Sequence, residues 1–177
     1  MNKHLLIKAG ITILLVSVLA IKVKLLNAEE QAKNQDALCA GKTYNGAWFD
    51  VRMPEGFTEQ PSLLSTSSDG YDSVWLRSPD GDLDLYIYSP QWAGEPSDVL
   101  DDAQISGIAE DTQSNEHGTV TVRKITYKNG QYGEFTSNYS NHNTHLTTGY
   151  RLSNPPLSEP QNQIHHCFLK SIQQYAD

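Results

Sequence analysis

The stretch that decides the fold is residues 74–88, VWLRSPDGDLDLYIY. Two runs of alternating apolar and polar residues flank Pro79–Gly81, a turn signal that is typical of a β-hairpin. Because successive strand residues point to opposite faces, the second run has one apolar and one mixed face. These faces hold Leu83, Leu85 and Ile87 on one side and Asp82, Asp84, Tyr86 and Tyr88 on the other. The stretch therefore predicts an antiparallel hairpin whose apolar face must pack on another layer.

Further strands are predicted on both sides of this hairpin. They cover residues 48–54, 119–127, 132–139 and 144–151. Asn129-Gly130 is a strong hairpin signal between two of them. Residues 58–72 are rich in Ser, Gly and Asp and are expected to form a loop, whereas residues 98–112 fit either a short helix or an extended segment. The pattern predicts a long antiparallel meander.

A helix is predicted at the C-terminal end of the chain. Ser158 can cap it, with Gln161 three residues further on and Pro160 in the first turn. Its apolar face consists of Ile164, Cys167, Phe168, Ile172 and Tyr175. Because so short a helix is marginal alone, we expect it to dock on the sheet. The predicted fold class is α+β, an antiparallel β-sheet meander with a C-terminal helix packed on it.

The N-terminus has the features of a targeting segment. Two lysines and no acid occupy residues 1–8, and an apolar run of about 13 residues follows, the length of a signal-peptide core. Cleavage is expected after Ala28; the alternative is an uncleaved membrane anchor over residues 5–26. The predicted organisation is a signal peptide or anchor over 1–28, a polar tether over 29–44 and a single domain over 45–177.

The residues after the leader are strongly acidic. The chain has 13 basic and 21 acidic side chains, and the leader holds four of the basic ones and no acid, so 9 and 21 remain, a net charge of −12. Such a surface repels phosphate backbones, which argues against a nucleic-acid partner. Cys39 and Cys167 are the only cysteines. Outside the cytoplasm an even pair predicts a disulfide, the alternative being two unpaired thiols.

The acids of the hairpin turn form a weak metal candidate, made of Asp80, Asp82 and Asp84. A calcium loop of the EF-hand type requires glycine at its sixth position and an acid at its twelfth, and this turn has neither. A hairpin turn with two outward-facing acids is the favoured interpretation. The six histidines lack zinc-site spacing, and no nucleophile motif or Gly-rich phosphate loop occurs. The sequence indicates no cofactor.

Aromatic side chains give the best binding candidate. Trp75, Tyr86, Tyr88 and Trp92 are expected on the second face of the sheet. Exposed aromatic rings beside acids would suit recognition of a protein, a sugar or a cationic ligand. The alternative is that this face is covered and forms a second core layer.

The order of elements resembles the Mog/PsbP-like superfamily. Its pattern Phe-x-Val-x-x-Pro-x-Gly-Phe spans residues 49–57, a hairpin and a meander follow, and a closing helix ends over residues 168–172. Residues 89–92 and 170–177 are also similar to a group of small exported bacterial proteins with no assigned function. The resemblance implies an α/β/α sandwich over about residues 45–177. It transfers no catalytic residue, because superfamily members bind quite different partners.

These features predict an exported, non-catalytic binding or assembly module of the cell envelope, periplasmic or secreted. Its partner is expected to be a protein or a small ligand there, with membrane contact only through an uncleaved N-terminal segment. Two alternatives remain: a small extracytoplasmic hydrolase that uses surface carboxylates, and an accessory subunit tethered to the membrane by residues 5–26.

Overall fold

The structure, a computed structural model, describes residues 22, 37–62, 72–89, 104–140 and 145–175. The chain divides into two compact units, Met1–Ala37 and Leu38–Asp177. Apart from Lys22, the expected leader lies outside the described residues, so its cleavage stays a prediction. Within the described residues, no helix has the length and apolar character needed to cross a membrane.

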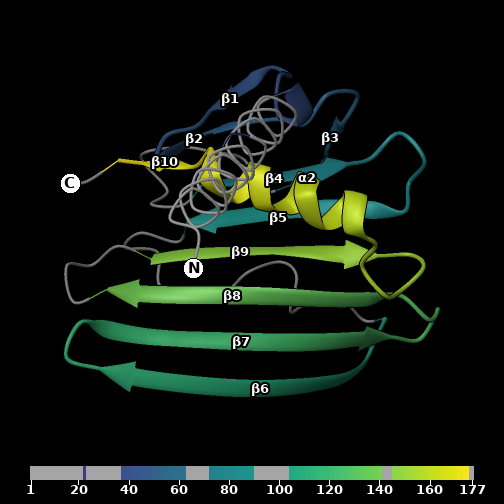
Figure 1. The fold of residues 1–177 in the computed structure, drawn as a ribbon. Helices are drawn as coiled ribbons and strands as arrows, with labels where there is room; N and C mark the ends of the chain where they lie inside the picture. The colour runs from purple at the N-terminus through teal and green to yellow at the C-terminus, as the bar shows by residue number, and fades with distance from the viewer. Residues whose placement is uncertain (1–21, 23–36, 63–71, 90–103, 141–144, 176–177) are drawn as a thin grey trace, which may run out of the picture. The chain divides into compact units, whose positions relative to one another are not determined.

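A seven-stranded sheet forms the body of the second unit (Figure 1), with strand order β3-β4-β5-β9-β8-β7-β6. The strands are β3 (Thr58–Gln60), β4 (Asp72–Arg77), β5 (Leu83–Ser89), β6 (Ile105–Asn115), β7 (Gly118–Tyr127), β8 (Tyr132–Ser140) and β9 (His145–Leu152). All their pairings are antiparallel, as predicted. The predicted hairpin is β4-β5, and Gly81 takes a positive φ of 75° in its turn, a conformation that favours glycine. Of the ambiguous residues 98–112, those from Ile105 on are extended, because β6 pairs along nearly all of β7; residues 98–103 lie outside the described residues.

A second, smaller sheet has the order β1-β2-β10. Its strands are β1 (Thr43–Asn45), β2 (Phe49–Arg52) and β10 (Gln173–Gln174). β2 was predicted, whereas β1, β3 and β10 are two or three residues long and too short to show alternation. β1 begins within the stretch expected to be a tether, so the folded unit starts earlier than residue 45.

Helix α2 (Glu159–Lys170) is the predicted C-terminal helix. Ser158 and Gln161 form the expected capping box, and a proline lies in the first turn. The prediction that the helix runs to Tyr175 is wrong. The Ser171 amide bonds back to the carbonyls of Cys167 and Phe168, and the chain then leaves the helix to pair with β2. The backbone hydrogen bonds of β10 outweigh the helical spacing of the last apolar residues.

The main core lies between α2 and one face of the sheet. Phe168 of α2 and Phe49 of β2 are fully buried there. They pack with Val51, Phe57, Val74, Leu76, Leu83, Leu85, Ile87 and Leu152. Full burial of each such apolar side chain contributes about 1.5–3 kcal/mol to the stability of the fold. As Figure 1 shows, α2 crosses the half of the sheet that contains β4, β5 and β9, and leaves β6 and β7 clear of it.

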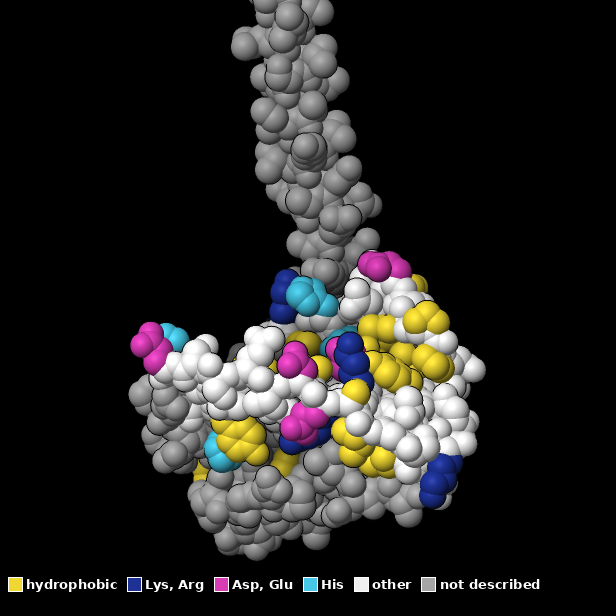
Figure 2. All heavy atoms as spheres, turned by 90° about the horizontal axis from the view of Figure 1, so that it is seen from below, with side chains coloured by type: hydrophobic (Ala, Val, Ile, Leu, Met, Phe, Trp, Pro, Cys, Tyr) yellow, Lys and Arg dark blue, Asp and Glu magenta, His cyan; other side chains and the backbone are white. Residues whose placement is uncertain are grey.

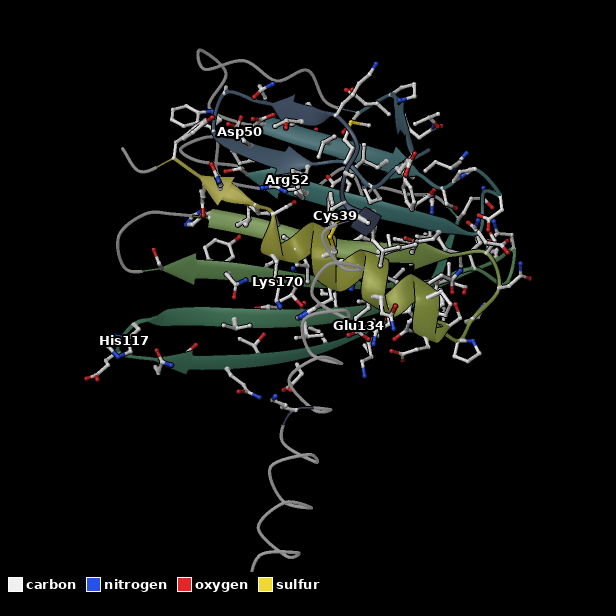
Figure 3. All side chains as sticks on the ribbon, turned by 45° about the horizontal axis from the view of Figure 1, so that its top comes forward. Cys39, Asp50, Arg52, His117, Glu134 and Lys170 are labelled. Carbon is white, nitrogen blue, oxygen red and sulfur yellow. A yellow bond between two sulfur atoms is a disulfide. The ribbon has the colours of Figure 1, made fainter. Side chains whose placement is uncertain are left out.

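Two links fasten the small sheet and the N-terminal end of the unit to the rest. Asp72, fully buried at the start of β4, accepts the Tyr44 hydroxyl at 2.6 Å and the Trp48 amide at 3.0 Å. The predicted disulfide is present: Cys39 is bonded to Cys167 of α2, and their Cα atoms are 6.2 Å apart (Figure 3). The disulfide fits a protein of an oxidising, extracytoplasmic compartment.

The second face of the sheet, turned away from α2, carries its own apolar cluster. It consists of Tyr86, Tyr88, Ile125, Tyr127 and Phe135. Among the described residues α2 is the only long helix, so the second helical layer of an α/β/α sandwich is not found in this part of the chain.

Candidate functional site: an arginine–aromatic surface

Two arginines flank a buried aspartate beside aromatic rings on the second face of the sheet. One row of side chains crosses β4, β5 and β9. In it Arg77 is the register partner of Asp84, and Asp84 is the register partner of Arg151. Trp75 and Tyr127 lie next to this row and contact Arg151. We call these five residues the arginine–aromatic surface.

Asp84 is the centre of the row. Its two carboxylate oxygens accept Arg77 Nε at 2.8 Å and Arg77 Nη2 at 3.1 Å, and one of them also accepts Arg151 Nη2 at 3.0 Å. The exposed fraction of the side chain is 6% for Asp84, 13% for Arg151 and 40% for Arg77. Hydrogen bonding to Asp84 raises the pKa of Arg77 above its already high ordinary value. The surface therefore holds one buried carboxylate between two permanent cations.

The expectation of an outward-facing Asp84 is wrong, and the reason is its strand. β5 lies inside the sheet, and β4 and β9 each place an arginine directly opposite residue 84. A carboxylate with two guanidinium partners tolerates burial that an unpaired one would not.

Aromatic rings hold the Arg151 guanidinium in place. Its Cζ atom lies 4.4 Å from the Trp75 ring and 5.5 Å from the Tyr127 centroid. Trp75 meets Tyr86 edge-on at 6.3 Å, and Tyr86 meets Phe135 edge-on at 6.0 Å. Stacked guanidinium groups of this kind gain from cation–π attraction and lose little freedom when they form hydrogen bonds. The surface is thus preorganised.

The predicted aromatic residues differ in exposure. Trp75 is partly exposed, whereas Tyr86 and Tyr88 are each only 3% exposed and belong to the second apolar cluster. Trp92 lies outside the described residues. For the two tyrosines the burial fits the alternative of a second core layer. A binding role for the predicted residues stays a prediction.

The acids of the hairpin turn have structural contacts. Asp80 accepts the Ser78 hydroxyl and the Asp82 amide, and these bonds lower the pKa of Asp80. Asp82 accepts the Asn154 side-chain amide at 2.7 Å. Within the described part of the chain, no group of three or more His, Cys, Asp or Glu residues is placed to hold a metal.

A third arginine continues the surface toward the edge of the sheet. Arg123 of β7 pairs with Glu110 at 2.8 Å and reaches the Ser137 hydroxyl at 3.3 Å. None of these three arginines was among the binding residues expected from the sequence. Strand parity was the available signal, since Arg77 lies two residues from Trp75 and therefore on the same face.

A separate titratable cluster lies under α2. The His165 ring meets the Tyr150 ring at 4.9 Å, and the Tyr132 hydroxyl donates to Glu134 at 3.1 Å. Burial lowers the pKa of His165 to about 4, although the Glu134 carboxylate acts in the opposite direction. Burial and Glu134 also raise the pKa of Tyr132 to about 12. His165 is partly buried because its side of α2 faces the sheet.

This cluster predicts a pH-dependent loss of stability. Unfolded His165 titrates near pH 6.5 and folded His165 near pH 4, so its contribution is intact above pH 6.5 and is lost as the pH falls toward 4. Within that window the free energy of unfolding falls by about 1.4 kcal/mol per pH unit. We expect His165→Gln to gain stability relative to the wild type between pH 6.5 and pH 4, measured by urea unfolding. The exposed His166→Gln is the control, and a His165→Gln curve parallel to the wild type would contradict the expectation.

Comparisons with known proteins give distant structural likenesses. No family model matches the chain, and no curated protein matches it. The chain is similar to the solution structure of cyanobacterial PsbP (CyanoP) from Synechocystis sp. PCC 6803, with 12% identity and a TM-score of 0.45 over 76% of this chain and 92% of that chain. It is also similar to a crystal structure from Bacteroides thetaiotaomicron VPI-5482, with 13% identity and a TM-score of 0.37 over 77% of this chain and 49% of that one.

The chain thus spans about half the length of the Bacteroides protein. Both TM-scores lie below 0.5, so the Mog/PsbP-like resemblance seen in the sequence stays a prediction. At these identities and TM-scores, neither likeness carries a functional argument. The α+β fold rests on the strand order and on the docking of α2.

Proposed function

We propose that this chain is an extracytoplasmic, non-catalytic binding module whose arginine–aromatic surface contacts a partner in the cell envelope. The observation that carries the proposal is the gathering of arginines. Three of the four arginines of an acidic chain lie on one sheet face, one of them stacked between aromatic rings. Arginine, tryptophan and tyrosine are the residue types that dominate binding energy at protein interfaces.

The charges of the surface favour an anionic group on the partner. Asp84 neutralises one of the two guanidinium groups that it contacts, so the row of Arg77, Asp84 and Arg151 carries a net positive charge. Arg77 is the accessible member, with 40% of its side chain exposed. A carboxylate or another planar anion on the partner would suit its guanidinium, which favours paired hydrogen bonds. The location outside the cytoplasm is supported by the disulfide and the leader.

The test compares Arg77→Ala with Arg52→Ala, which removes an exposed arginine of β2 outside the surface. Each exported protein is used to capture partners from envelope extract, and the captured protein is then titrated in purified form. We expect Arg77→Ala to weaken binding at least tenfold, about 1.4 kcal/mol, and Arg52→Ala to leave it unchanged. Equal affinities for the wild type and Arg77→Ala would overturn the proposal.

A further inference from the structure

Strand β6 is the long, open edge of the main sheet. It ends the strand order, and among the described strands only β7 pairs with it. Every residue from 108 to 117 is exposed. In Figure 1 β6 is the outermost strand, and Figure 2 views the molecule from that side. The opposite edge, β3, has only three residues.

The direction of the free backbone groups of β6 follows from the neighbouring hairpin. The Tyr127 amide donates to the Gln131 carbonyl at 3.0 Å, so the odd-numbered residues of β7 bond to β8. Its even-numbered residues therefore bond to β6, where their partners are Ala109, Asp111, Gln113 and Asn115. The amides and carbonyls of Ile108, Glu110, Thr112 and Ser114 consequently point outward from the sheet.

This edge lacks most of the features that keep an edge strand from pairing with a strand of another molecule. β6 contains no proline and no lysine, and its one register irregularity, between Ile105 and Gly107, lies at its start. Glu110 is held by Arg123. Two of the four most exposed large apolar side chains among the described residues lie on this hairpin, Ile108 at 51% and Val120 at 41%.

We propose that β6 pairs antiparallel with β6 of a second copy of this chain, about a two-fold axis at Thr112. Charge excludes three registers, because an axis at Glu110 or Asp111 places an acid opposite itself, and an axis at Gln113 places Glu110 opposite Glu116. An axis at Ile108 or Ala109 would pair across the register irregularity between Ile105 and Gly107, and an axis at Ser114 would carry the pairing past the end of β6 at Asn115. With the axis at Thr112 no acid faces an acid. The resulting pairs are Thr112 with Thr112, Asp111 with Gln113, Glu110 with Ser114 and Ile108 with Glu116.

The dimer is weak and depends on concentration. One pair of strands buries less than the roughly 1,200–2,000 Å² of a stable protein interface. Both copies are acidic, so association needs an ionic strength of about 0.15 M to screen their repulsion. The inference is independent of the arginine–aromatic surface and of any envelope partner.

The first test removes the outward amide of Thr112. Thr112→Pro deletes an N–H that does not bond to β7, a position where an edge strand tolerates proline. Thr112→Val loses the same hydroxyl but keeps the amide, and is the matched control. In sedimentation equilibrium at rising protein concentration, we expect the wild type and Thr112→Val to dimerise and Thr112→Pro to stay monomeric. Circular dichroism checks that each variant is folded.

A second test does not depend on the fold of the proline variant. Only the residue on the axis faces its own copy, at a Cα separation of about 5.5 Å that suits a disulfide. We expect Thr112→Cys to form a covalent dimer on oxidation and Ser114→Cys to form none. A wild type that stays monomeric throughout, or equal cross-linking at both positions, would overturn the proposal. If the wild type stayed monomeric, the natural partner of the β6 edge would instead be an extended segment of another protein.

Discussion

Replacing Cys39 and Cys167 together by alanine is expected to lower the free energy of unfolding by about 4 kcal/mol. The two cysteines are 128 residues apart in the sequence, so the disulfide removes a large part of the conformational freedom of the unfolded chain. Because Cys39 is buried, alanine is preferred to serine, which would add an unsatisfied hydroxyl.

Chemical unfolding with and without reductant tests this expectation. Reductant should destabilise the wild type by nearly as much as the double substitution does, and should leave the double variant unchanged. If reductant shifted both proteins equally, or if the double variant were as stable as the oxidised wild type, the disulfide would not be a main source of stability.

Asp84→Ala is expected to lower the free energy of unfolding by about 3 kcal/mol, because it leaves buried positive charge without a partner. Arg151 accounts for most of this loss, since its side chain is only 13% exposed and its guanidinium stays between Trp75 and Tyr127. Arg77 is 40% exposed and can be rehydrated, so its share is small.

Glu110→Ala is the matched control for this prediction. It breaks the ion pair with Arg123 on the same face of the sheet, but the Glu110 side chain is 48% exposed. Exposed pairs contribute about 0–1 kcal/mol. Urea unfolding of both variants measures the difference, and equal losses would mean that the burial of Asp84 has no energetic consequence.

The parts of the fold that follow local rules were predictable. Alternation from Val74 to Tyr88 and the turn at Gly81 were enough for the central hairpin, and Asn129-Gly130 marked the next one. Ser158 and Gln161 located the start of α2 correctly, because a capping box is a local hydrogen-bond pattern.

The parts that failed depend on residues far apart in the sequence. Nothing near Lys170 shows that the helix ends there, because the competing partner is β2, more than a hundred residues earlier. β10 has only two residues, which is too short for any periodicity.

The candidate site shows the same division. Strand parity placed Tyr86 and Tyr88 on the second face, but their burial arises from Ile125, Tyr127 and Phe135, which come from other strands. The pairing of Asp84 with Arg151 spans 67 residues and exists only because β9 lies beside β5. The sequence held the three arginines, but only the strand order shows that they share a face.

The bond between Cys39 and Cys167 also determines how the protein responds to proteases. A single cut at any peptide bond between these two residues, including those in 63–71 and 90–103, leaves two fragments that are still covalently joined. A nicked molecule would keep its intact size on a gel until a reductant separated the pieces. In an oxidising compartment outside the cytoplasm, where reductants are scarce, cleavage of this chain need not release either fragment.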